Sequence, residues 1–106
     1  MTSHPGWIAA EWPAPENIIA GCSLRHGGVS SGSFDSLNLG GHVGDENECV
    51  VENRQRLISA CKLPAEPTWL KQVHGNALVV DPDRQSRPEA DAILSRKPGS
   101  VCAVLI

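Results

Sequence analysis

One helical pattern stands among several short apolar runs along this chain. In residues 46–61, apolar side chains recur at the spacing of a single helix face. The pattern predicts a helix whose buried face is formed by Val50, Leu57, Ile58 and Cys61. Helical periodicity therefore accounts for one segment of the chain, and the rest must be strands and loops.

Two acidic residues predict how this helix begins. Asp45 is a suitable N-cap, and Glu48 lies three residues later, as in a capping box. Pro64 follows the pattern and predicts its end. The sequence thus gives the helix a start signal and a stop signal.

The short apolar runs predict strands on both sides of the helix. They cover residues 17–25, 68–74, 77–81, 90–95 and 100–106. Gly75-Asn76, between the second and third runs, predicts a hairpin. The last run is apolar on both faces, which is typical of a strand in the middle of a sheet. Strands with one packed helix predict the α+β class, with a mixed or antiparallel sheet.

Composition changes this picture mainly by exclusion. The 106 residues predict one domain, with residues 1–16 as a loose arm or an edge segment. A formal net charge of −3 argues against a nucleic-acid partner, and no apolar run is long enough for a membrane span. The N-terminus lacks the pattern of a secretory signal. Four scattered cysteines without CxxC spacing predict reduced thiols and a cytoplasmic protein.

Two glycine-rich segments carry polar groups that could bind a ligand. Residues 25–32, "RHGGVSSG", could cradle a phosphate beside Arg25, but such a segment is more often a structural turn. Residues 36–46 place Asn38 and His42 among glycines. His42 could be a metal ligand, although most surface histidines are not.

The stretch "WLKQVHGNALVV", residues 69–80, poses a sharper question. Alternation along a strand would put Leu70, Gln72 and His74 on one face, just before Gly75. An amide and an imidazole at that point could simply be solvated, or they could begin a metal or acid–base site. No second His or Cys lies at a ligand spacing from His74.

Taken together, the motifs resemble a known family. "LRHGGVSSGSFDSLNLGGHVGDENECVVENRQRL", "WLKQVHG" and "ADAILSRKPGSVCAVLI" occur in this order over residues 23–106. They resemble the laccase-domain (YfiH-type) family, which is known both as multicopper polyphenol oxidase and as purine nucleoside phosphorylase. The family pattern has T-R-x-G-G-V-S where this chain has Leu24 in place of Thr.

The resemblance implies a fold and a metal site. It implies a single α+β domain longer than this chain, so residues 1–106 look like the N-terminal part of a truncated member. His74 resembles the first of three zinc ligands, and copper is the older assignment. The family's cysteine and second histidine lie in segments that this sequence lacks, and Cys102 does not take the cysteine's place.

The resemblance also implies a chemistry. The substrates are purine nucleosides (adenosine, inosine, guanosine and methylthioadenosine) with phosphate, and adenosine is deaminated as well. The residues expected to take part are His74, Arg25 at the phosphate, Asn38 and Gln72. An isolated chain of this length is expected to be inactive and to self-associate through its exposed last strand. The alternatives are a non-catalytic, partner-binding remnant and a peptidoglycan precursor editing factor.

Overall fold

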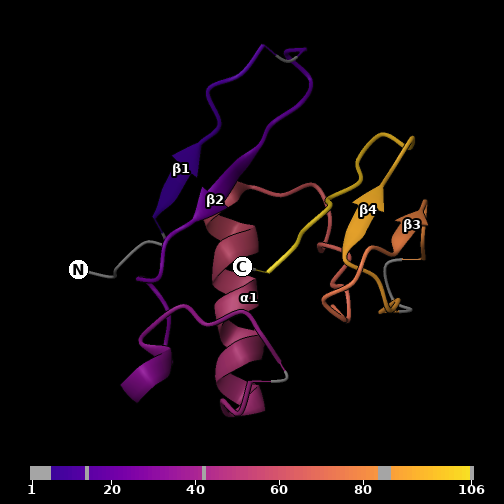
Figure 1. Cartoon of the computed structure of the whole chain (residues 1–106). Helices are drawn as coiled ribbons and strands as arrows, with labels where there is room; N and C mark the ends of the chain where they lie inside the picture. Colours follow the sequence, from indigo (N-terminus) through magenta and orange to yellow (C-terminus); the bar gives the residue numbers. More distant parts are fainter. Residues whose placement is uncertain (1–5, 14, 42, 84–86, 106) are drawn as a thin grey trace. The chain divides into compact units, whose positions relative to one another are not determined.

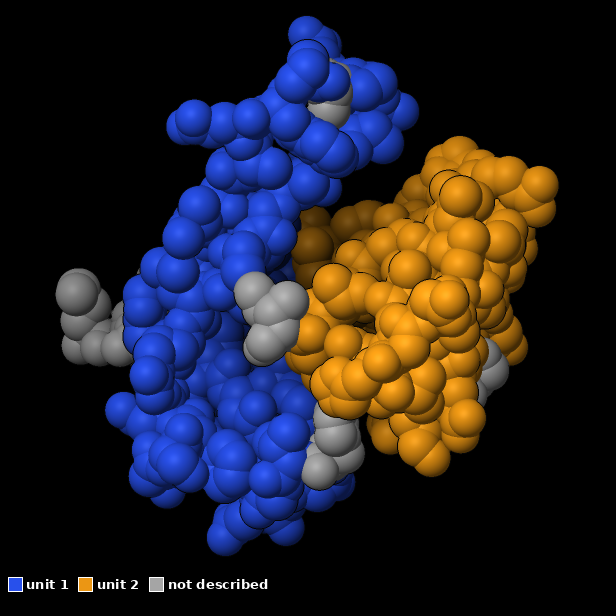
Figure 2. Space-filling model, viewed as in Figure 1, with its two compact units in different colours: residues 1–61 blue, residues 62–106 orange. Residues whose placement is uncertain are grey.

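The computed structural model describes residues 6–13, 15–41, 43–83 and 87–105. The chain divides into two compact units, Met1–Cys61 and Lys62–Ile106 (Figure 2). The first contains strands β1 (Trp7–Ala9) and β2 (Gly21–Ser23), the 3-10 turn η1 (Gly32–Phe34) and helix α1 (Asn47–Cys61), and the second contains strands β3 (Leu78–Val80) and β4 (Ala92–Leu94) (Figure 1). The α+β class is confirmed, but the strands form two separate two-stranded sheets.

In the first unit, β1 and β2 form an antiparallel pair. Trp7 lies opposite Ser23, and Ala9 lies opposite Gly21. A side chain at position 21 would collide with the Trp7 ring, since an added Cβ would lie 2.5 Å from it. Within residues 1–16, which were expected to be a loose arm or an edge segment, Trp7–Ala9 form an edge strand, and residues 1–5 and 14 lie outside the described residues. The predicted strand over 17–25 is wrong in extent, because only β2 is paired as a strand.

Helix α1 forms where the apolar periodicity predicts it. Val50 and Leu57 are buried, as expected, whereas Ile58 and Cys61 are only half-buried. The face between Val50 and Leu57 is completed by Asn53, which is 0% exposed. A polar residue thus occupies the centre of the buried face.

The start of α1 differs from the prediction. The carbonyl of Glu46 accepts the N–H groups of Cys49 and Val50, so Glu46 occupies the N-cap position. Asp45 lies one residue earlier, and its Oδ1 accepts the N–H of Glu46 at 2.8 Å. The predicted capping box between Asp45 and Glu48 is therefore wrong, since Asp45 is committed to the loop before the helix.

In the second unit, β3 and β4 are parallel, with Leu78 opposite Ala92 and Val80 opposite Leu94. The predicted hairpin is wrong. Residues 68–74 instead make two isolated parallel bridges, Thr68 with Cys102 and Lys71 with Glu89. The chain does not fold back at Gly75-Asn76, because residues 73–75 are held by a side chain from the second half of this unit, described below.

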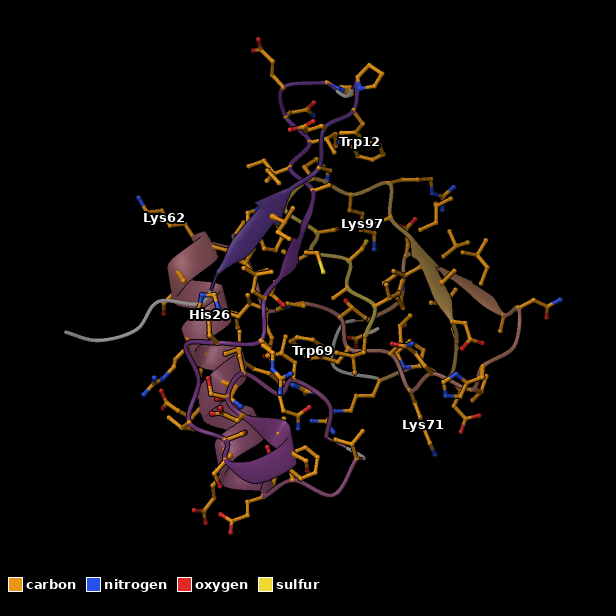
Figure 3. The ribbon with its side chains drawn as sticks, turned by 60° about the vertical axis from the view of Figure 1, so that its left-hand side comes forward. Trp12, His26, Lys62, Trp69, Lys71 and Lys97 are labelled. Atoms are coloured by element: carbon orange, nitrogen blue, oxygen red, sulfur yellow. The ribbon has the colours of Figure 1, made fainter. Side chains whose placement is uncertain are left out.

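The core of the second unit contains adjacent residues. Trp69 and Leu70 are both 7% exposed, so the predicted strand alternation does not hold there. Lys71 extends outward into solvent, whereas Trp69 is buried (Figure 3). In the predicted strand 100–106, the described residues make one bridge, at Cys102, and Val104 is 52% exposed. The expectation of a strand buried on both faces is wrong for 100–105, and Ile106 lies outside the described residues.

Within the described part of the chain, no helix has the length and apolar character needed to cross a membrane.

Candidate functional site

The turn at residues 73–75 is built around one carboxylate. Oδ1 of Asp91 accepts the backbone N–H groups of Val73 at 3.0 Å and His74 at 2.8 Å. Oδ2 accepts the N–H of Gly75 at 2.8 Å. Three consecutive backbone donors therefore converge on one side chain, an arrangement that otherwise binds anions.

The ionisation of Asp91 reflects this arrangement. Desolvation by the surrounding protein would raise its pKa, but the hydrogen bonds from Gly75, His74 and Val73 outweigh it. The pKa of Asp91 therefore lies below its ordinary value, and the carboxylate is the form that holds the turn.

His74 adopts an uncommon backbone conformation in this turn. Its φ is 58°, in the left-handed region that few residues other than glycine occupy. Its side chain is exposed. A Cβ added at Gly75 would lie 3.5 Å from Oδ2 of Asp91, an ordinary contact, so the close packing here does not require a glycine. The turn therefore leaves the imidazole of His74 exposed on the surface.

The described residues offer His74 as a single metal donor. No group of three or more His, Cys, Asp or Glu side chains that could hold a metal is present in 6–13, 15–41, 43–83 and 87–105. The oxygens of Asp91 are already engaged by backbone donors. An imidazole is a suitable ligand for zinc, so the assignment of His74 as one zinc ligand stays a prediction, and His42 lies outside the described residues.

The Gln72 side chain has a clear structural partner. Its Nε2 donates to the carbonyl of Leu105 at 3.0 Å, and its Oε1 accepts the N–H of Leu105 at 2.7 Å. The amide thereby pairs with the backbone of a distant residue as a neighbouring strand would. Gln72 ties the segment before His74 to residues 101–105, and its expected part in catalysis stays a prediction.

In the first unit, the glycine-rich loop closes on helix α1 through Asn53. Oδ1 of Asn53 accepts the N–H of Val29 at 2.8 Å. Its Nδ2 donates to Oγ of Ser30 and to the carbonyl of Asn38, each at 2.8 Å. One buried amide thus joins both glycine-rich segments to the helix.

The same loop has little capacity left for cradling a phosphate. The N–H groups of Gly28, Val29 and Ser30 donate to Oγ of Ser36, to Asn53 and to the carbonyl of Ser36. A cradle needs such donors directed at the anion. The turn interpretation of this segment is therefore the better one.

Arg25 precedes the loop and is exposed. Its Nε donates to the carbonyl of Asp35 at 3.1 Å, which fixes the direction of the guanidinium. The two terminal nitrogens make no hydrogen bond to another residue in the described part of the chain. They are the donors that an anion would need.

Asn38 belongs to a polar cluster with Asp45 and Ser30. Its Nδ2 donates to the carbonyl of Gly40 at 3.1 Å and to Oδ2 of Asp45 at 3.2 Å. Its Oδ1 accepts the N–H of Gly40 at 3.1 Å. The hydroxyl of Ser30 is the main cause of the lowered pKa of Asp45, and Asn38 and the Glu46 N–H add to it. Asn38 supports this loop, and its expected role toward substrate stays a prediction.

Two arginines of α1 complete the attachment of the loops. Nε and Nη2 of Arg54 donate to the carbonyl of Leu39 at 3.0 and 2.8 Å. Nη1 of Arg56 donates to the carbonyl of Gly27 at 3.2 Å. Hydrogen bonds from helix α1 therefore hold the loops that carry Arg25 and Asn38 in place.

The sequence-predicted residues fall into two pairs, Arg25 with Asn38 in the first unit and Gln72 with His74 in the second. Sequence reasoning missed the two residues that organise these neighbourhoods, Asn53 and Asp91. Both stood in quoted motifs, "ENRQRL" and "ADAIL". The signal that could have identified Asn53 is its position between Val50 and Leu57 on the apolar face.

Comparison with known proteins agrees with these motifs. The purine nucleoside phosphorylase YfiH of Escherichia coli (strain K12) is 48% identical over 99 residues, which cover 92% of this chain and 41% of the relative. A crystal structure of a Neisseria meningitidis protein matches with a TM-score of 0.82 at 36% identity, over 94% of this chain and 41% of that one.

The structure of YlmD from Geobacillus stearothermophilus matches with a TM-score of 0.81 at 30% identity, over 92% of this chain and 40% of that one. The chain thus spans about 41% of the length of the curated YfiH relatives that it matches. A family model described as "Multi-copper polyphenol oxidoreductase laccase" matches residues 19–106. By this match and these identities, the chain belongs to the laccase-domain family, whose N-terminal portion it covers.

Proposed function

We propose that this chain forms the N-terminal part of a purine nucleoside phosphorylase. The observation that carries the proposal is His74, an exposed imidazole held in a turn by Asp91, in a chain 48% identical to a relative of that name. An accessible imidazole in a fixed backbone is suited to bind a metal or to move a proton. The proposed site is completed by the part of the relatives to which this chain has no counterpart.

The proposed substrates are adenosine, inosine, guanosine and methylthioadenosine, each with inorganic phosphate. In phosphorolysis, a phosphate oxygen forms a bond to C1′ of the ribose while the bond from C1′ to the base nitrogen breaks. The electron pair leaves with the base, which takes up a proton. Adenosine deamination is proposed at the same site, with water adding to C6 and ammonia leaving.

Arg25 is proposed to bind the phosphate. Its terminal nitrogens can form two parallel hydrogen bonds to phosphate oxygens, and the bond from Nε to the carbonyl of Asp35 keeps the guanidinium plane oriented. Asn38 and Gln72 are proposed to act beside Arg25 and His74, respectively, chiefly by keeping their segments in place.

Zinc is the proposed metal, with His74 as one ligand through a ring nitrogen. A bound zinc ion would supply Lewis acidity and would lower the pKa of a coordinated water. Copper is the older assignment in the family, and a site of two histidines and one cysteine suits zinc at least as well. The chain's own part is to hold the imidazole accessible and correctly oriented.

Two further features bear on the protein's setting. All four cysteines are free thiols, which supports a reducing compartment such as the cytoplasm. Several large apolar side chains are exposed, including Trp12 at 58% and Ile19 at 88%. Such surface supports the proposal that the isolated chain self-associates.

The test uses this chain extended with the remaining part of the E. coli relative. We expect phosphate-dependent release of hypoxanthine from inosine, and zinc at one equivalent by atomic absorption. His74→Asn should abolish most of both, because asparagine tolerates the left-handed conformation but has no imidazole. Arg25→Lys should raise the KM for phosphate more than the KM for inosine, because a two-point contact becomes a point charge.

Gln55→Ala, an exposed change on α1, is the control and should leave zinc and turnover unaltered. Full zinc content and full turnover in His74→Asn would refute the proposal. The 106-residue chain alone should show no phosphorolysis, and activity there would mean that other residues complete the site.

A further inference from the structure

Among the ion pairs of lysine and arginine in the described part of the chain, none involves the carboxylate of Asp91. Both of its oxygens face backbone N–H groups, three in a row, at 2.8–3.0 Å. Most acidic side chains at a surface face water or a basic residue. An acid enclosed by consecutive amides determines the path of the chain that supplies them.

The central one of these three amides belongs to His74. The left-handed conformation at φ 58° costs free energy in any residue with a Cβ, so something must compensate for it. The hydrogen bonds to Asp91 require Val73, His74 and Gly75 to turn their N–H groups to one side. In that arrangement the direction of the Cα–Cβ bond of His74 is set by the backbone.

We propose that Asp91 is a positioning residue that fixes the turn at 73–75 and thereby the direction in which His74 presents its imidazole. This inference rests on the proposed function only where it gives His74 a part in zinc binding and turnover. The hold on the turn stands on the three hydrogen bonds alone.

The placement of Asp91 in the fold supports this role. It directly precedes β4, and the N–H groups of Asp91 and Ala92 donate to the carbonyl of Ala77 at 3.0 and 3.2 Å. Asp91 is thus anchored on the chain that enters β3, which follows the turn it holds. These hydrogen bonds join the segment around His74 to Asp91, which lies 17 positions further along the chain.

The first measurement is amide hydrogen exchange followed by NMR on the 106-residue chain. Asp91→Ala should accelerate exchange at Val73, His74 and Gly75 by about tenfold or more, the change expected when a hydrogen bond to a charged acceptor is lost. Asp91→Asn keeps one acceptor oxygen and should give a smaller change. His74 should also lose the strong intraresidue NOE from N–H to Hα that a positive φ produces.

Asp81→Asn is the matched control. Asp81 is also a carboxylate that accepts a backbone N–H, that of Arg96 at 2.8 Å, and like His74 it has a positive φ, of 46°. Asp81 follows β3, whereas the turn at 73–75 precedes β3. Asp81→Asn should therefore leave the exchange rates of the Val73, His74 and Gly75 amides unchanged. Unchanged exchange and an unchanged NOE in both Asp91 variants would overturn the inference.

The second measurement uses the extended polypeptide of the previous section. Asp91→Asn should lower turnover at limiting zinc, and excess zinc should restore it, since a misplaced ligand weakens a site without removing it. A loss that excess zinc does not restore would contradict positioning. If His74→Asn has no effect on zinc or turnover while the exchange result holds, the proposed function fails and the assignment of the turn stands.

Discussion

At the scale of single residues, Gly28 shows how closely the loop is packed. A Cβ added there would lie 2.1 Å from the carbonyl oxygen of Ser36 and 2.5 Å from Oδ1 of Asn53. Neither atom can move without breaking the hydrogen bonds that hold the loop. Only a glycine fits, and the reason is steric.

We therefore expect Gly28→Ala to lower the free energy of unfolding by about 1–3 kcal/mol, the range for overpacking. Gly41→Ala is the control, because its nearest contact would be Nη2 of Arg54 at 3.8 Å, and it should change stability by less than about 0.5 kcal/mol. Urea unfolding followed by circular dichroism measures both. Equal effects of the two variants would contradict the steric explanation.

Sequence reasoning at this scale found residues better than it found their partners. Arg25, Gln72 and His74 were identified from motifs. The partners of Gln72 and His74, Leu105 and Asp91, lie 33 and 17 positions away. A local pattern carries no information about such contacts, because they depend on how the chain returns on itself.

At the scale of elements, α1 and the strands differ in how far the sequence predicts them. The helix depends on bonds between residues four apart, so a window of sixteen residues contains its whole pattern. The strands β3 and β4 are parallel, and a parallel pair needs a crossover whose path the apolar runs do not show. The turn signal at Gly75-Asn76 was misleading for this reason.

Gln72 provides the element-scale prediction. Gln72→Ala should speed exchange of the Leu105 N–H about tenfold, because it removes the side-chain acceptor that this N–H uses. Gln72→Glu keeps that acceptor but places a carboxylate against the carbonyl of Leu105, so it should accelerate exchange less than Gln72→Ala does. Exchange at Leu105 equal to that of the unaltered chain in both variants would show that other contacts hold residues 101–105.

At the scale of the whole molecule, lowered pKa values of carboxyl groups predict loss of stability in acid. Hydrogen bonding with Ser30 is the main reason for the lowered pKa of Asp45, and the Arg96 N–H is the main reason for that of Asp81. Each pKa lies below the ordinary 3.8, so the unfolded chain binds more protons in that interval. The stabilisation by these two carboxylates is complete above their ordinary pKa. It is lost as the pH falls through their lower pKa in the folded chain.

When urea unfolding is measured between about pH 5 and about pH 2, the urea concentration at the midpoint should therefore decrease once the pH is below about 4. Asp45→Asn should make that decline shallower, because one of the linked groups no longer titrates. A decline of unchanged slope in this variant would show that Asp45 is not one of those groups.

The attachment of both glycine-rich loops to α1 has a consequence for the order of events in folding. The loops bond to Asn53, Arg54 and Arg56, whose side chains are held in these relative positions only after the helix has formed. A helix of this size forms in about a microsecond or less, so it can be present before the loops settle. The segment that carries Arg25 and Asn38 should consequently acquire its shape late. Substitutions in this segment should accelerate unfolding while leaving the refolding rate almost unchanged.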